Sequence, residues 1–135
     1  MQTLIMISNN DITVTDLMET LPAKYAPISL GPAGFVIQRN RENRTTAYVR
    51  VRKLDNPAAE YDGSDSPPFP VGPETRGFLI EFNDLALLKE VAPLLADRND
   101  VAIDDDHGNI VLGSDFVTGI ARSNTLGWLP SDYKT

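Results

Sequence analysis

Two consecutive stretches of the chain show the same order of expected elements, and this order constrains the fold more than any single motif. In each half, an apolar strand precedes an amphipathic helix, a second strand, a tight turn and a third strand. These are residues 4–7, 14–21, 26–30 and 35–37 in the first half, and 76–82, 85–95, 101–103 and 110–112 in the second. Two such units predict an α+β fold, with one mixed or antiparallel sheet and two or three helices packed on it.

The two halves also align at a constant offset of 75 residues. The aligned apolar pairs are Ile5 with Ile80, Ile7 with Phe82, Ile28 with Ile103, Phe35 with Ile110, and Ile37 with Leu112. This alignment is compatible with an internal duplication. Residue identity between the halves is low, so a coincidence of similar patterns is the alternative.

Side-chain caps and one proline set the expected limits of the helices. Thr13 and Asp16 have the spacing of a capping box. Asn83 and Ser114 are expected to cap the later helices. Pro93 lies inside the second helix, where a proline removes a backbone hydrogen bond, so we expect a kink or a restart there.

Residues 45–54 show the clearest alternation in the chain. Ala47, Val49 and Val51 are expected on one side of this strand, with Tyr48, Arg50 and Arg52 on the other. The polar side suits the solvent-exposed face of a two-layer fold. It superficially resembles an RNA-binding strand, but it lacks neighbouring aromatic residues, and pairing of these arginines with acidic residues of the chain is favoured.

The length suits one domain that spans residues 1–135. Residues 55–75 contain five of the ten prolines, together with glycine, serine and aspartate, and no regular element is expected there. A loop of this length is usually functional or disordered.

Composition excludes several classes of function. The chain has no cysteine and one histidine, which removes disulfides, thiolate zinc sites and cysteine nucleophiles. The net charge of −7 argues against nucleic acid as the main partner. No signal peptide or membrane span is recognisable, so we expect a cytoplasmic location, no membrane partner and no cofactor.

The negative charge is unevenly distributed. Residues 1–53 carry seven basic and four acidic side chains, whereas residues 54–135 carry five basic and fifteen acidic ones. Much of this negative charge lies in the loop at 55–75 and in the run Asp104–Asp106. Such a surface can steer a basic protein towards it, and an exposed aromatic side chain can anchor the complex.

These two segments therefore supply the candidate partner-binding residues. They are Glu60, Tyr61, Asp62, Asp65 and Phe69 in the loop, and Asp104, Asp105 and Asp106 in the hairpin. The alternative for the loop is a mobile, solvated segment.

Motifs for catalysis and metal binding are absent. The chain has no nucleophile elbow, phosphate-binding glycine loop or HExxH motif. His107 beside Asp104–Asp106 is the remaining candidate for a general base, although a lone histidine in a polar turn usually faces solvent. The same acidic run misses the spacing of an EF-hand, so no metal site is predicted.

The segment from Phe78 to Trp128 resembles small acidic immunity proteins of bacterial toxin systems. The shared features are a strand, a leucine-rich helix, the acidic hairpin "DDDHGNIV", the helix start "GSDFV" and a terminal tryptophan. The resemblance implies a binding protein whose acidic surface covers the active site of a basic toxin. It assigns no role to an individual residue.

The sequence thus predicts a non-enzymatic, immunity-type protein with a basic protein partner, present as a monomer or dimer. The alternatives are a structural or accessory assembly protein of the phage or secretion-system type and, third, a carboxylate-based enzyme.

Overall fold

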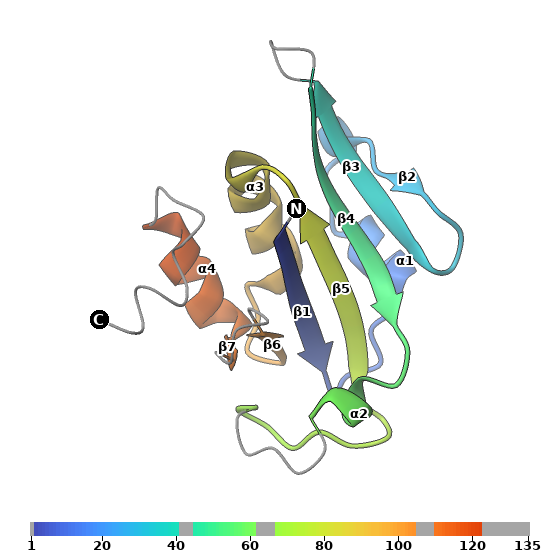
Figure 1. Cartoon of the computed structure of the whole chain (residues 1–135), viewed down its shortest axis with the longest axis vertical. Helices are drawn as coiled ribbons and strands as arrows, with labels where there is room; N and C mark the ends of the chain where they lie inside the picture. The colour runs from blue at the N-terminus through green and yellow to red at the C-terminus, as the bar shows by residue number, and fades with distance from the viewer. Residues whose placement is uncertain (1, 41–44, 62–66, 105–109, 123–135) are drawn as a thin grey trace.

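The fold is an α+β arrangement in which seven strands form one antiparallel sheet (Figure 1). The computed structural model describes residues 2–40, 45–61, 67–104 and 110–122. The strands are β1 (Gln2–Ser8), β2 (Ile28–Ser29), β3 (Gly34–Asn40), β4 (Thr46–Leu54), β5 (Arg76–Phe82), β6 (Val101–Asp104) and β7 (Ile110–Leu112). Their order across the sheet is β2-β3-β4-β5-β1-β6-β7, so the N-terminal strand lies between two strands from the second half.

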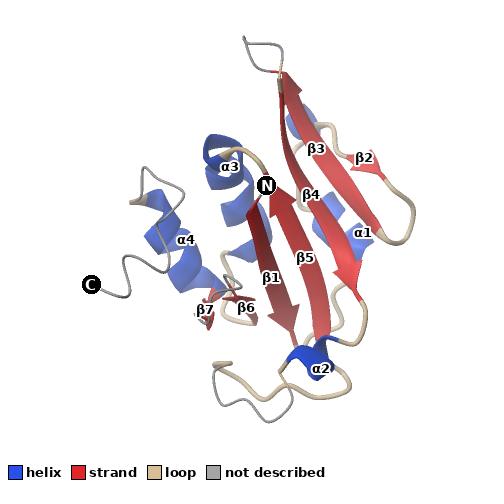
Figure 2. Cartoon of the chain, in the orientation of Figure 1, coloured by secondary structure: helices blue, strands red, loops and turns tan. Residues whose placement is uncertain are grey.

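Three helices cover one face of this sheet (Figure 2). They are α1 (Val14–Glu19), α3 (Leu85–Ala96) and α4 (Gly113–Ala121). A 3₁₀ turn at Ala23–Tyr25 follows α1, and the single helical turn α2 (Pro57–Glu60) lies at one end of the sheet. None of the described helices is long and apolar enough to cross a membrane.

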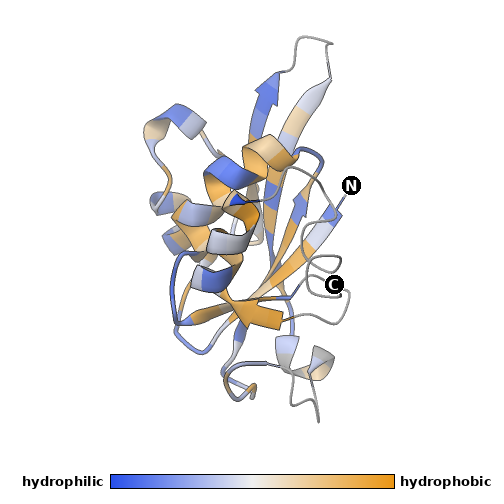
Figure 3. Cartoon of the chain, turned by 90° about the vertical axis from the view of Figure 1, so that its left-hand side faces the viewer, coloured by the Kyte–Doolittle hydropathy of each residue, from blue (hydrophilic) through white to orange (hydrophobic). Residues whose placement is uncertain are grey.

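The main core lies between the sheet and the three helices. Leu4, Met6, Val49 and Ile80 point to it from the strands, and Leu17, Leu87, Val91 and Phe116 meet them from the helices. Figure 3 shows hydrophobic colouring where these two layers meet. Burying each large apolar side chain contributes roughly 1.5–3 kcal/mol, so the amphipathic helices are held by packing more than by their intrinsic propensity.

Strand β1 is buried on both faces, which its continuous apolar run favours. Leu4 and Met6 face the main core, while Ile5 and Ile7 face a second cluster on the opposite side of the sheet. The solvent-exposed outer face expected of a two-layer fold is therefore wrong for this part of the sheet. Tyr61, Phe69 and Val71 from the loop segment pack there with Ile5 and Ile7.

The expected polar side of β4 is confirmed on the remaining part of the outer face. Arg50 and Arg52 both pair with Glu81 on the neighbouring strand β5, at 3.0 and 2.8 Å. The carboxylate of Glu81 is 5% exposed. The sequence-based prediction that these arginines pair with acidic residues of the chain is therefore confirmed for both Arg50 and Arg52.

Two of the expected caps differ in the structure. The capping box of Thr13 and Asp16 is present. Asp84, one residue after the expected Asn83, caps α3 by accepting a hydrogen bond from the Leu87 N–H at 2.8 Å. Asn83 instead accepts a hydrogen bond from the Tyr48 N–H, which ties the end of β5 to β4.

Helix α4 begins without a side-chain cap, because its N-cap residue is Leu112; Ser114 lies inside the helix and donates its hydroxyl to Oδ1 of Asn99. Helix α3 runs without interruption through Pro93, so the expected restart does not occur. Pro93 is exposed, and a helix carbonyl that loses its partner on the solvent side can bind water.

The two halves contain their elements in the expected order, but the offset of 75 residues does not relate equivalent positions. It aligns Ile5 and Ile7, which face the second cluster, with Ile80 and Phe82, which face the main core. It also aligns Ile28, which is 49% exposed, with the fully buried Ile103. Because side chains alternate in a strand, a register error of one residue exchanges the two faces of a sheet.

Candidate functional site

The loop segment at 55–75 lies against the sheet, and its described parts are 55–61 and 67–75. Helix α2 provides a regular element that the sequence did not predict. Pro57 of α2 is buried and lies so close to Gly77 that a Cβ atom at Gly77 would be 2.7 Å from the Pro57 Cβ. Glycine at this position lets α2 rest directly on β5.

The two aromatic residues of the loop belong to the second hydrophobic cluster. Tyr61 is 6% exposed, and its hydroxyl donates a hydrogen bond to Oδ2 of Asp104 at 2.7 Å. Phe69 is half-buried against the same cluster. The prediction of an exposed aromatic anchor is therefore wrong for Tyr61, because its ring covers apolar residues of its own chain.

The hydrogen bond from Tyr61 brings the two predicted segments together. Asp104 ends β6 at the beginning of the acidic hairpin, and Tyr61 follows α2 in the loop. The two residues are 43 positions apart in sequence. Asp62, Asp65, Asp105 and Asp106 lie outside the described residues, as does the side chain of Glu60.

The C-terminal end of the loop is fixed by a small polar network. The buried Thr75 hydroxyl donates to Oδ1 of Asn9 at 2.6 Å and accepts from the Gly72 N–H at 3.0 Å. The Asn9 amide donates to the carbonyl of Pro70 at 2.7 Å. Residues 70–75 are thereby tied to the end of β1.

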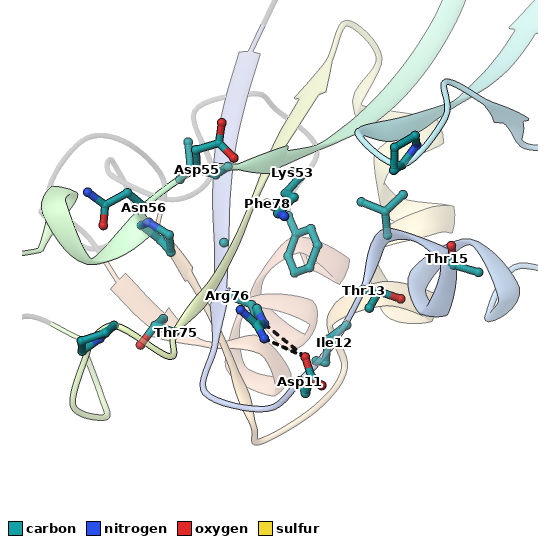
Figure 4. A pocket seen from close by; sticks show the side chains of 16 residues that line it. Asp11, Ile12, Thr13, Thr15, Lys53, Asp55, Asn56, Thr75, Arg76 and Phe78 are labelled. Atoms are coloured by element: carbon teal, nitrogen blue, oxygen red, sulfur yellow. Dashed lines mark hydrogen bonds and ion pairs between the residues drawn. The ribbon is translucent and has the colours of Figure 1, made fainter.

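A pocket of about 500 Å³ lies where this loop meets the ends of β4 and β5 (Figure 4). Its walls come from four separate stretches of sequence, namely residues 11–15, Pro32, residues 53–57, and residues 73 and 75–78. Apolar side chains include Ile12, Val14, Leu54 and Phe78. Its volume falls within the usual range for small-molecule sites.

Four charged side chains also line the pocket. Arg76 donates to Oδ1 of Asp11 from Nη2 at 2.9 Å and from Nε at 3.2 Å. Asp11 is 82% exposed, so this pair is weak. Lys53 and Asp55 have no ion pair among the described residues. In Figure 4 the Asp55 carboxylate lies at the upper end of the pocket, apart from the ring of Phe78.

Two carboxylates outside the pocket, those of Glu81 and Glu90, form ion pairs with arginines. Burial raises the pKa of Glu81, but the hydrogen bond from Arg50 and the attraction of Arg50 and Arg52 outweigh it, and the pKa is lowered overall. The hydrogen bond from Arg39 lowers the pKa of Glu90 in the same way. These groups are structural ion pairs rather than reactive acids.

The described residues contain no group of three or more metal-ligating side chains. His107, the candidate general base, lies outside the described residues. The pocket residues were not predicted as a site, because no motif links them and each stretch already had a local explanation. Lys53 falls on the side of the alternating strand that carries Ala47, Val49 and Val51, and a cation on that apolar side was the available signal.

Comparison with known protein families, with curated proteins and with solved structures finds no match to this chain.

Proposed function

We propose that this chain is a non-enzymatic binding protein of the immunity type, which neutralises a basic toxin by protein–protein contact at the loop 55–75 and the adjoining acidic hairpin. The observation that supports this proposal is the position of Asp55 and Glu74. They stand at the two ends of the loop, are exposed, and have no ion pair among the described residues.

The charge balance of the described surface favours a basic partner. Arg39, Arg50, Arg52, Arg76 and Arg98 each pair with a carboxylate of their own chain. These five arginines share four carboxylates, namely those of Glu90, Glu81, Asp11 and Asp100, so the pairs account for none of the net charge of −7. Exposed carboxylates of this kind accelerate the encounter with a basic protein, and salt weakens the effect.

The way the loop is attached also favours binding. Tyr61 holds one part of it through the second cluster, and the Thr75 network holds the other end. An interface segment whose ends are already fixed loses less conformational entropy when a partner binds. With Tyr61 inside the fold, the proposed contact consists of the acidic side chains of the loop rather than of this aromatic residue.

The test pairs this chain with the product of the neighbouring gene, which is expected to encode a secreted toxin. The association rate is measured at low and at high salt for the wild type and for the double variant Asp55→Lys/Glu74→Lys. The matched control is Glu19→Lys/Asp97→Lys, which makes the same charge change at exposed positions away from the loop. We expect tight, salt-sensitive binding and a much larger loss of rate in the loop variant.

Two outcomes would contradict the proposed interface. Equal losses in the loop variant and the control would mean that only the net charge matters. An unchanged association rate at low salt after reversing Glu60, Asp62 and Asp65 together would remove the loop from the interface.

A second candidate is an assembly protein that associates through an edge of its sheet. Ile28 and Leu30, at the β2 edge, are the exposed large hydrophobic residues of the described part, at 49% and 46%. The flanking Pro27 and Pro32 restrict strand addition at this edge. A large closed ring in solution would favour assembly, whereas a monomer or dimer would favour the binding protein.

A further inference from the structure

We propose that the pocket between the ends of β4 and β5 binds a small organic acid, with the carboxylate held by Lys53 and Arg76 and an apolar body resting against Phe78. This site adjoins the toxin contact proposed above, because Asp55 lines the pocket, but it is argued from other side chains and does not depend on that contact. It is assigned from the pairing of the charged groups in the pocket and from the composition of its walls.

Lys53 is placed at the pocket by the register of the sheet. It lies opposite Phe78 across the β4–β5 ladder, so its side chain points to the same face as this buried ring. Among the described residues its ammonium group has no carboxylate partner. In an acidic chain whose arginines 39, 50, 52, 76 and 98 are paired, an unpaired cation at a pocket is available to an anionic ligand.

Arg76 provides a second donor on the same face. It precedes Phe78 by two residues on β5 and is therefore the diagonal neighbour of Lys53, where Cα atoms are about 7–8 Å apart. Its Nε and Nη2 atoms bind Asp11, which leaves Nη1 without an acceptor among the described residues. Two long side chains at this separation can both reach the oxygens of one carboxylate.

The acidic residues of the lining do not occupy this position. Asp11 is held by Arg76 and is 82% exposed, so it faces solvent at the edge of the pocket. The carboxylate of Asp55 lies at the upper end of the pocket in Figure 4, and not beside the ring of Phe78. The ammonium group of a ligand beside Phe78 would be repelled by Lys53, which lies opposite Phe78 on β4, so the site favours an anion over a cation.

The apolar residues of the lining indicate the chemistry of the rest of the ligand. Ile12, Val14, Leu54 and Phe78 provide apolar walls, and Pro32 and Pro57 close two sides. Burying an apolar group against these walls stabilises the complex. The site therefore matches a carboxylate attached to a hydrocarbon or aromatic body, rather than a bare inorganic anion.

The test uses three probes of the same shape and different charge, namely 3-phenylpropanoate, 3-phenylpropanamide and 3-phenylpropylamine. Each is titrated into the full chain at pH 7 while amide chemical shifts are recorded by NMR. We expect saturable shifts at Thr13, Lys53 and Gly77 with the acid, and on the order of tenfold weaker binding of the amide, because the amide has no negative charge to attract Lys53 and Arg76.

Two variants connect the result to the assigned residues. Lys53→Met keeps the length of an exposed side chain and removes its charge, and we expect it to weaken binding of the acid by about tenfold. Lys24→Met makes the same change outside the pocket, where Lys24 lies over the ring of Tyr25, and should leave binding unchanged. Circular dichroism is used to check that both variants are folded.

Any of several results would overturn the proposal. These are equal binding of acid and amide, stronger binding of the amine, an acid affinity that Lys53→Met leaves unchanged, or no saturable shift at the pocket. None of them bears on the toxin contact, which is measured with a different partner and different variants.

Discussion

The contact between α2 and β5 provides a sharp test of how the loop is held on the sheet. In Gly77→Ala the added Cβ would lie 2.7 Å from Cβ and 3.1 Å from Cγ of Pro57, and 3.3 Å from Cδ2 of Leu54. Real Cβ atoms do not approach a neighbour within 3.0 Å, and the ring of Pro57 is rigid. Helix α2 must therefore move away from β5, and the packing of Tyr61 behind it is disturbed.

The magnitude follows from a matched pair of glycines. Gly72 lies in the same loop, has no atom within 4 Å of an added Cβ, and does not have a positive φ. Replacing either glycine by alanine reduces the entropy of the unfolded chain similarly, which stabilises by about 0.4–1 kcal/mol. The difference between the two variants isolates the clash, which we expect to cost about 1–3 kcal/mol.

The assay is urea unfolding of the wild type, Gly77→Ala and Gly72→Ala, followed by circular dichroism. We expect Gly72→Ala to be equal to or slightly more stable than the wild type, and Gly77→Ala to be clearly less stable than both. Equal stability of the two variants, within about 0.5 kcal/mol, would refute the packing of α2 on β5.

Three further predictions test the ion pair, the buried hydroxyl and the helix cap. Because the pKa of Glu81 is lowered in the folded state, its ionised carboxylate stabilises the fold above the unfolded pKa of about 4.5, and this stabilisation is lost as the pH falls. In Glu81→Gln, stability should therefore fall less steeply between about pH 5 and pH 3 than in the wild type, measured by urea unfolding at each pH. Tyr61→Phe removes a buried hydrogen bond and should lower the free energy of unfolding by about 1 kcal/mol. The control is Tyr48→Phe, which should have little effect, because Tyr48 is half-buried and its hydroxyl has no hydrogen bond among the described residues. Thr13→Ala loses the capping box and should cost about 1 kcal/mol in the same assay, whereas a similar loss from Thr15→Ala, at an exposed position inside α1, would contradict a specific role of the cap.

Local patterns predicted most of the regular elements. The bounds of β5 and β7 agree with the sequence-based expectation, because apolar runs bounded by turn residues describe strands directly. The capping box of Thr13 was also predicted, since it depends on residues only three positions apart. The expected restart at Pro93 failed because the helix is held by packing along its length, which local propensity does not describe.

The candidate sites were predictable only in part. Charge counts identified the acidic loop, but they indicated nothing about the direction in which Tyr61 points. That direction depends on Ile5 and Ile7, which lie more than fifty residues earlier and form an apolar surface on the outer face of the sheet. The pocket depends on long-range pairing even more, because Asp11 and Arg76 meet only after β1 and β5 have paired.

By itself, the sequence determined the α+β class, most of the strands and helices, and the concentration of negative charge in the second part of the chain. These properties depend on residue type and on spacings of a few positions. The tertiary structure alone decided the order of the strands, the second cluster beneath the loop and the pocket beside Lys53. Each of these features joins segments that are far apart in the chain. The pairing register of the strands decides which side chains face one another there, and a shift of one residue would exchange the two faces of a strand.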